Sequence, residues 1–463
     1  MSRARAWSDR MARVNACLLG LALALAGCEE PPPARASGDV LPYRPDLRLQ
    51  TFQTTIANGA TSFIDIDLPE GASSMLIEVR SSRGFFFVDQ FFTPTGQELA
   101  RTGQFLTREA REVSGLADFL FPNDDTFAPL PGRYRVSFAA FSDRDGTQPL
   151  PDGSAEVRVY TVQRNVDDTC GIYLDFLVDY EAIDQASFQE AIGRLVGRID
   201  AIYRQVGVAV IDYQVQQINL QSPDINVGSD TVLAVADDVL RQARAVGSAR
   251  AGALHVMVVR SIEGESASGF NPAGYSMGLP GPYDADRPNA TVLVSTSHYA
   301  SLNANGVLVL DVDGMATSLA HELGHFMGLY HPSEPSGSGH DPLIETPECG
   351  TPSSCNDAFR QNIMTSSSWL TSAGLNPAFR MTLTSGQGRV IRRHPLCEPF
   401  AVEMIPDPTC ELECDPPETC AVLPDGAGGR NEACISACDP RAGMPCPTGG
   451  DCLSDLLGTN VCQ

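Results

Sequence analysis

The sequence contains no lysine, so all 32 of its basic residues are arginine. Without lysine the chain can form no lysine Schiff base and has no phosphate-loop lysine, which excludes several enzyme classes. Basic charge is scarce as well, because 57 acidic residues give a formal net charge of -25. A surface this acidic repels phosphate backbones, and we therefore expect no nucleic-acid partner.

The chain also has few long apolar segments. The run at residues 16–26 follows four arginines between residues 3 and 13 and is too short to span a bilayer, which is typical of a secretory signal. It ends in Leu-Ala-Gly-Cys at 25–28, which resembles the bacterial lipobox, and this resemblance implies that Cys28 is lipidated. An ordinary cleavage site with an incidental cysteine is the alternative. We expect an exported lipoprotein, anchored to a bacterial membrane and facing the periplasm or the cell surface.

Cysteine is abundant by contrast. Of the 14 cysteines, Cys17 leaves with the signal and Cys28 carries the lipid, so twelve remain, and an even number in an exported chain predicts six disulfides. The tail lacks the paired C-x2-C spacings of a zinc ribbon, so we expect small disulfide-stapled repeats there. The eight tail cysteines are Cys410, Cys414, Cys420, Cys434, Cys438, Cys446, Cys452 and Cys462.

The hydrophobic pattern changes along the 463 residues, a length that allows two to four domains. Residues 64–68 alternate apolar and acidic side chains, which predicts strands, whereas strand and helix patterns alternate after Cys170. The sequence therefore predicts a signal peptide 1–27, a proline-rich tether 28–45, a β-sandwich 46–165 that is either a removable pro-domain or a permanent accessory, a catalytic domain 166–397, and a cysteine-rich tail 398–463.

The chemistry centres on residues 321–331, which read His-Glu-Leu-Gly-His-Phe-Met-Gly-Leu-Tyr-His. His321 and His325 lie one helical turn apart, so both imidazoles can reach one ion at about 2.0 Å. His331 would lie about 15 Å further along the same helix, so the chain must turn back, and Gly328 permits such a turn. Three histidines leave the fourth position of a tetrahedral zinc open, and Glu322 is placed as the general base.

These residues carry a family resemblance. Residues 321–331 are similar to the zinc motif of the metzincin clan, and 361–364 (Gln-Asn-Ile-Met) resembles its methionine turn, which implies that Met364 lies beneath the zinc. Within the clan the chain resembles the pappalysin-type peptidases through these further segments: 329–331, 340–347, Cys349, Cys355, 274–275, 279–280 and 384–387.

The resemblance implies a fold class and a function. The expected architecture is an α+β metzincin-type catalytic domain, preceded by an all-β sandwich and followed by a small disulfide-rich tail. The expected activity is zinc-dependent hydrolysis of protein or peptide substrates. The resemblance further implies a calcium ion held by Asp341, Glu345 and Thr346, with a solvated loop as the equal alternative, because Glu345 stands where the family usually has aspartate. Ser366 stands where family members often have a tyrosine, so a tyrosine role is not expected.

Two other functions compete with this one. Residues 274–278 spell the G-x-S-x-G of serine hydrolases, but that motif needs a strand before it and a helix after it, and the flanking sequence is rich in glycine, serine and proline. A zinc-carrying adhesion lipoprotein without turnover is the second alternative. The retention of Glu322 favours catalysis.

Cys170 has two possible roles. Its thiolate could occupy the open zinc position and hold the enzyme latent. Alternatively, it forms a disulfide with Cys397 that ties the first strand of the catalytic domain to its end, with Cys349 and Cys355 as a second pair. We favour the disulfide, because the four cysteines outside the tail form an even set.

Overall fold

A computed structural model describes most of the chain after residue 36. The chain divides into two units, residues 1–33 and residues 34–463, and the expected signal peptide and Cys28 lie outside the described residues. No helix in the described part is long and apolar enough to cross a membrane. The described residues are 37–40, 44–101, 114–125, 127–143, 146–179, 183, 185–220, 224–227, 236, 238, 240, 252–263, 272–285, 287–302, 308–334, 340–350, 355–366, 382–399, 418–424, 430–436, 452–454 and 460–462.

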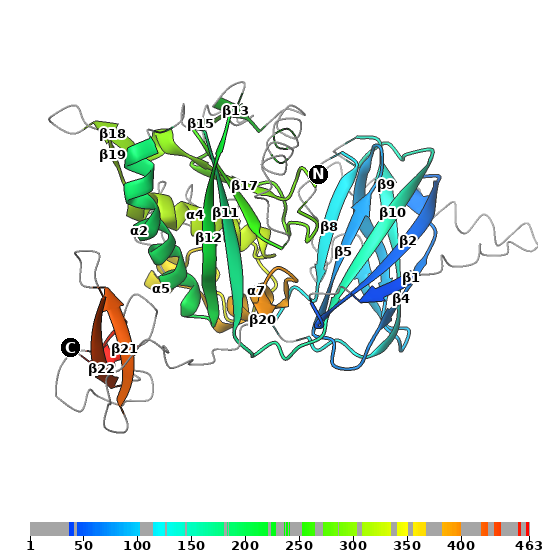
Figure 1. Cartoon of the computed structure of the whole chain (residues 1–463). Helices are drawn as coiled ribbons and strands as arrows, with labels where there is room; N and C mark the ends of the chain where they lie inside the picture. The colour runs from blue at the N-terminus through cyan, green and yellow to red at the C-terminus, as the bar shows by residue number, and fades with distance from the viewer. Residues whose placement is uncertain are drawn as a thin grey trace, which may run out of the picture. The chain divides into compact units, whose positions relative to one another are not determined.

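The first part is one antiparallel sheet, drawn in blue to cyan in Figure 1. Its strand order is β7-β6-β9-β3-β2-β10-β5-β8, with β1 paired to β2 and β4 to β9. The predicted alternation is present, because Ile64, Ile66 and Leu68 are buried while Asp67 is exposed. The strands are β1 (Ser37–Val40), β2 (Leu47–Ala57), β3 (Ala60–Thr61), β4 (Ile64–Leu68), β5 (Ser74–Arg80), β6 (Phe85–Phe92), β7 (Glu98–Arg101), β8 (Leu116–Phe121), β9 (Gly132–Phe141) and β10 (Asp152–Val162).

The predicted fold class, an α+β metzincin-type domain after a β-sandwich, was wrong. Strand makes up 43% of the structure and helix only 19%, and the largest element is a single curled antiparallel sheet. Period-two alternation identifies the buried face of a strand but does not show whether a sheet splits into two layers or curls. Register shifts in β6 bend this sheet. A zinc motif, in turn, specifies one helix and one turn and does not determine the class of the whole chain.

The second part contains a sheet of order β12-β11-β14-β17-β16. Its first four strands are parallel, β16 is antiparallel to β17, and β20 pairs with β11. The elements are β11 (Cys170–Asp179), β12 (Val208–Ile218), β14 (Leu254–Val259), β16 (Gly274–Ser276), β17 (Thr291–Ser295), β20 (Glu398–Pro399), α2 (Gln185–Arg204), η2 (Thr296–His298), α4 (Val312–Phe326), α5 (Asp357–Gln361) and α7 (Ser385–Arg393).

The two faces of this sheet have separate cores. Phe176 and Val256 point to the face on which α2 and α4 pack, while Leu177 and Met257 belong to the core on the other face. The two helices are joined by a hydrogen bond from the Tyr203 hydroxyl to the Ala320 carbonyl, at 2.7 Å. Helix α4 is therefore fixed between α2 and the sheet, which positions the histidines that it carries.

Four short strand pairs complete the described elements; β13 and β15 are parallel and the other three pairs are antiparallel. In the tail, the backbone register places Cys420 opposite Cys434 and Cys452 opposite Cys462. The strand pairs are β13 (Asp224–Asn226) with β15 (Ser261–Glu263), β18 (Ala300–Leu302) with β19 (Leu308–Leu310), β21 (Glu418–Pro424) with β22 (Arg430–Ser436), and β23 (Cys452–Ser454) with β24 (Asn460–Cys462).

Both predicted disulfides outside the tail are confirmed. Cys170 is bonded to Cys397 and Cys349 to Cys355, so Cys170 has no thiolate with which to block a metal site. The first bond joins residues 227 positions apart and the second residues only 6 apart. The long-range bond ties the first strand of the second sheet to the segment after α7.

Replacing Cys170 and Cys397 together by serine is expected to lower the free energy of unfolding by about 2–5 kcal/mol, because the unfolded chain regains the freedom of a long closed loop. The matched removal of Cys349 and Cys355 should cost less, since its loop is short. Urea unfolding followed by circular dichroism measures both. Equal losses for the two double variants would contradict the loop-length argument.

Candidate metal centre

Helix α4 positions three of the predicted site residues. Its first turn is capped by Asp311, whose side chain accepts a hydrogen bond from the Gly314 amide at 3.0 Å. The helix ends at Phe326, and Gly328 follows with φ +100°, a conformation that disfavours residues with a Cβ. The chain turns back there as the sequence predicts and brings His331 to the other two histidines.

The imidazoles of His321, His325 and His331 converge on one point. Their Nε2 atoms lie 3.1, 3.1 and 3.3 Å from one another. Three nitrogens at about 2.0 Å from a tetrahedral ion would be about 3.3 Å apart, so the spacing matches a metal site. His321 and His325 are buried, while the side chain of His331 is 20% exposed, so solvent reaches the site from the side of His331.

The Nδ1 atoms all point away from this centre to fixed partners. His321 Nδ1 lies 2.7 Å from the Ile363 carbonyl and His325 Nδ1 lies 2.7 Å from the Leu329 carbonyl. A carbonyl can only accept, so both Nδ1 atoms carry the proton and both Nε2 atoms present lone pairs. Lone pairs this close repel one another unless a cation lies between them. These three histidines can therefore bind a metal ion, and neutral imidazole nitrogens are a donor set that suits zinc.

Met364 lies beneath the helix, fully buried. A Cβ on Gly324 would lie 2.4 Å from the Met364 sulfur, so glycine between the two helical histidines is what allows this close approach. The Met364 amide is held at 2.9 Å by the Asn362 side chain. The carbonyl of Ile363, the residue before Met364, accepts the hydrogen bond from His321. The turn at 361–364 therefore orients His321 and also fills the space beneath helix α4.

Glu322 lies beside the histidines with its carboxylate held by the neighbouring sheet. Its Oε2 accepts a hydrogen bond from the Ser276 amide at 2.7 Å. A Cβ on Gly274 would lie only 2.6 Å from Glu322 Cγ, so β16 can approach the carboxylate only with glycine at that position. Only 9% of Glu322 is exposed. The end strand of the described sheet therefore orients the predicted general base.

The predicted calcium ligands are brought together only in part. Thr346 Oγ1 and the Leu343 amide donate to Asp341 Oδ1, while the buried Asp341 Oδ2 has no hydrogen-bond partner among the described residues. Burial raises the pKa of the Asp341 carboxyl to about 7, against the lowering effect of these hydrogen bonds. Glu345 is turned away and accepts from the Ser385 hydroxyl and, at 3.1 Å, the Gly386 amide.

The serine-hydrolase alternative lacks its structural context. Ser276 ends β16 and is followed by a loop that leads to β17, and its buried hydroxyl donates to the Gly278 carbonyl at 2.5 Å. The four histidines outside the motif also have their own partners in the fold. His394, for example, donates from Nε2 to the Gly281 carbonyl at 3.0 Å and accepts the Leu396 amide at Nδ1, so it is a neutral packing residue.

Sequence reasoning missed two parts of this centre. Glu334 Oε2 lies 3.4 Å from His331 Nδ1 and so completes the outer partners of the three histidines. The sequence signal that could have indicated this contact was a glutamate three residues after His331. The contact of Gly274 and Ser276 with Glu322 joins two segments far apart in the sequence, and no local pattern indicates it.

Comparison with known proteins gives little further guidance. No protein-family model and no curated protein matches the sequence. Among solved structures, the chain is similar to metalloproteinase-II from Bacteroides fragilis (12% identity, TM-score 0.23, 39% of this chain) and spans about half of that protein, 54%. It is also similar to a family two carbohydrate esterase from Cellvibrio japonicus (13%, TM-score 0.18, 63% of this chain and 98% of that one). A third similar structure is TmCBM61 in complex with β-1,4-galactotriose (11%, TM-score 0.15, 29% and 90%). All three TM-scores lie below 0.5, so these likenesses assign neither fold nor activity.

Replacing Glu334 by alanine is expected to weaken metal binding about tenfold, the lower end of the usual effect of removing an outer partner of a metal-bound histidine. Glu334→Gln should lose less, because its amide oxygen can still accept the Nδ1 proton. Titration of the apoprotein with zinc against a competing chelator measures both, with the exposed Glu190→Ala on α2 as control. Wild-type affinity in Glu334→Ala would show that this carboxylate does not fix His331.

Proposed function

We propose that the protein is a zinc-dependent peptidase whose ion is held by His321, His325 and His331. The observation that carries the proposal is the convergence of three Nε2 atoms at 3.1 to 3.3 Å with a carboxylate on the same helix. A three-histidine site leaves room for chemistry at the metal, unlike the closed four-ligand sites of structural zinc. The motif-level resemblance to pappalysin-type peptidases supports the same activity.

The chain's own residues perform the proton transfers in this proposal. When bound, zinc supplies Lewis-acid assistance and activates water for attack at neutral pH. Glu322 accepts the proton of the attacking water and returns it to the leaving amine. The Ser276 amide keeps one carboxylate oxygen in place, so the other oxygen is the one that exchanges the proton.

The position of β16 supports a peptide substrate. It is the end strand of the described sheet, paired on one side with β17, and its Ser276 amide points away from β17 to Glu322. An extended peptide can lie along such a strand and align its backbone by hydrogen bonding. A zinc-carrying adhesion protein without turnover is the alternative, but binding alone does not require a carboxylate oriented beside the metal.

Glu322→Gln is expected to retain the metal and lose peptide hydrolysis by at least about 10²-fold, the usual contribution of a general base. The exposed Glu190→Gln on α2 is the matched control and should hydrolyse at the wild-type rate. Cleavage of a quenched casein-derived peptide, with metal content measured on the same samples, tests this. Wild-type turnover in Glu322→Gln would contradict the proposal, and an inactive wild-type protein with bound zinc would favour the adhesion alternative.

We further propose that calcium binds at Asp341. Among the described residues, the buried Asp341 Oδ2 has no hydrogen-bond partner, and the negative charges of Glu348 and Asp125 further raise the pKa of this carboxyl. A buried carboxylate oxygen of this kind is a suitable calcium ligand. Thr346 lies against the same carboxylate, whereas Glu345 would have to leave the N-terminus of α7 to join it.

Removing calcium alone with a selective chelator should lower the melting temperature while zinc stays bound. A ligand present at 100 times its Kd stabilises by about 2.7 kcal/mol, so the shift is expected to be several degrees. Asp341→Asn should abolish the shift, whereas Asp67→Asn on the exposed face of β4 should preserve it. Identical melting curves with and without calcium would refute this site and leave the zinc site untouched.

Export and anchoring also remain proposals. Residues 1–28 have the layout of a lipoprotein signal, and the two disulfides suit an oxidising compartment. We propose that the protein acts on protein or peptide substrates outside the cytoplasm while Cys28 holds it at a membrane.

A further inference from the structure

Strands β5 and β8 of the first sheet are buried on both faces. Met75, Ile77 and Val79 point into the core of that sheet, whereas Leu76, between them, belongs to the core that contains helix α4. Leu76 lies opposite Leu120 of β8, which joins the same second core. The second face of these strands is buried although it carries polar as well as apolar side chains, so it is covered by other parts of the chain.

Acidic side chains on that face are neutralised by the second part. Glu78 and Asp118 lie opposite each other and are 2% and 0% exposed. Arg287, 1% exposed, lies between them, with Glu78 Oε2 3.0 Å from Nη1 and Asp118 in direct contact. Asn289 donates to Asp118 at 2.6 Å. These carboxylates and the guanidinium are thus shielded from water only where the two parts are in contact, and removing Arg287 alone would leave buried carboxylates unpaired.

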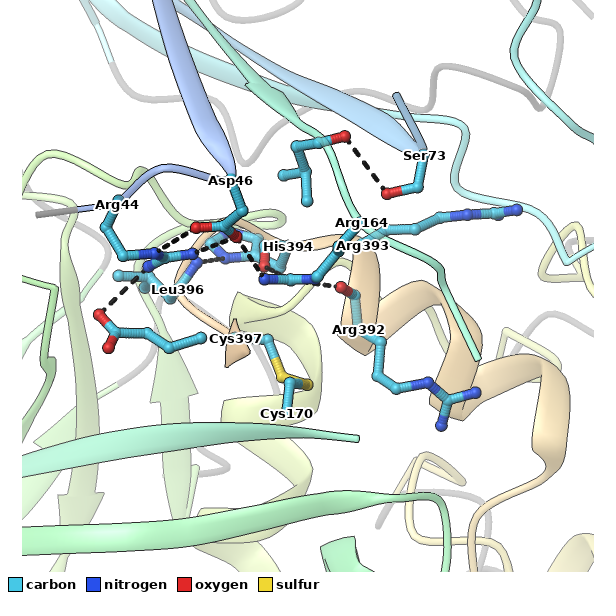
Figure 2. A network of polar contacts seen from close by, with 12 residues as sticks. Arg44, Asp46, Ser73, Arg164, Cys170, Arg392, Arg393, His394, Leu396 and Cys397 are labelled. Atoms are coloured by element: carbon cyan, nitrogen blue, oxygen red, sulfur yellow. Dashed lines mark hydrogen bonds and ion pairs between the residues drawn. A yellow bond between two sulfur atoms is a disulfide. The ribbon is translucent and has the colours of Figure 1, made fainter. Parts of the chain in front are cut away.

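A second polar contact joins the two parts at the end of α7 (Figure 2). Arg164, after β10, pairs with Asp46 at 3.0 Å and also donates to the carbonyls of Arg392 and His394. These carbonyls lie at the C-terminus of α7, where a cation is favourable. The Ser74 hydroxyl donates to the Arg393 carbonyl at 2.6 Å.

The same face contacts the turn that completes the metal centre. A Cβ on Gly328 would lie 2.8 Å from Leu120 Cδ2, so the turn between His325 and His331 packs directly on β8. The loop that contains Arg287 also reaches α4, because the Gly281 amide donates to the Phe326 carbonyl at 2.8 Å. The first sheet therefore contacts the Gly328 turn directly, and it reaches the C-terminus of α4 indirectly, through the loop that contains Arg287.

We propose that the first sheet is a permanent support of the metal centre and not a removable pro-domain. Its β5–β8 face is an obligatory intramolecular interface that holds the Gly328 turn and, through it, His331. The proposal does not rest on peptidase activity, because association and metal binding test it directly.

A specific protease site inserted between the exposed Asp167 and Asp168 allows the connection to be cut in the folded protein. Apart from the signal cysteine and Cys28, every cysteine lies at position 170 or later, so the cut leaves no disulfide between the two pieces. After cutting, both pieces should elute together in native gel filtration with zinc still bound. Separation in native buffer, whatever its effect on metal, would overturn the proposal.

Two substitution pairs test the individual contacts. Arg287→Met should lower the urea concentration at which the cut pieces separate, whereas Arg133→Met, at an exposed ion pair of the same sheet, should not. Leu120→Ala should weaken zinc binding severalfold, whereas Leu99→Ala, in the sheet's own core, should lower stability without changing zinc affinity. Equal behaviour within either pair would contradict the role assigned to that contact.

A measurement on the uncut chain covers the case in which the insertion prevents folding. Amide hydrogen exchange in increasing urea should show β5 and α4 losing protection at the same concentration, because they unfold as one unit. Loss of protection in β5 while α4 stays protected would overturn the proposal.

Discussion

The structure depends on one electrostatic constraint: three imidazole lone pairs held about one hydrogen-bond length apart. The Ile363 and Leu329 carbonyls fix the Nδ1 protons of His321 and His325, so both Nε2 atoms must face the shared centre as acceptors. A metal ion bound at that centre would relieve the repulsion between the lone pairs. The surrounding features follow from it, since the turn at Gly328 brings in His331, and glycine at 324 makes room for Met364, whose neighbour Ile363 orients His321.

The metal centre is supported from two directions by segments distant in sequence. Strand β16 reaches Glu322 through the Ser276 amide, and β8 reaches the Gly328 turn through Leu120. Both contacts need glycine on one side, at Gly274 and Gly328, because a Cβ would occupy the space of the partner. The Glu322 carboxylate and the third histidine are thus positioned by sheets rather than by the helix alone. A site held in this way keeps its geometry without depending on a bound substrate.

The sequence predicted the local chemistry better than the architecture. The spacing of His321, His325 and His331 and the glycine between them specify a helix and a turn, because those constraints act within eleven residues. The two disulfides were also predicted, from the even number of cysteines outside the tail and from the positions of Cys170 and Cys397 at the two ends of the domain. The curled sheet, the outward turn of Glu345 and the Arg287 contact were not, because each depends on pairing between distant segments that periodicity does not record.

X-ray absorption spectroscopy of the purified protein at the zinc edge tests the central claim most directly. If the three histidines hold the ion, the spectrum should show about three imidazole nitrogens at about 2.0 Å and no sulfur, and replacing His331 by alanine should remove one of them. Absence of bound zinc after reconstitution, or coordination by sulfur, would contradict the account.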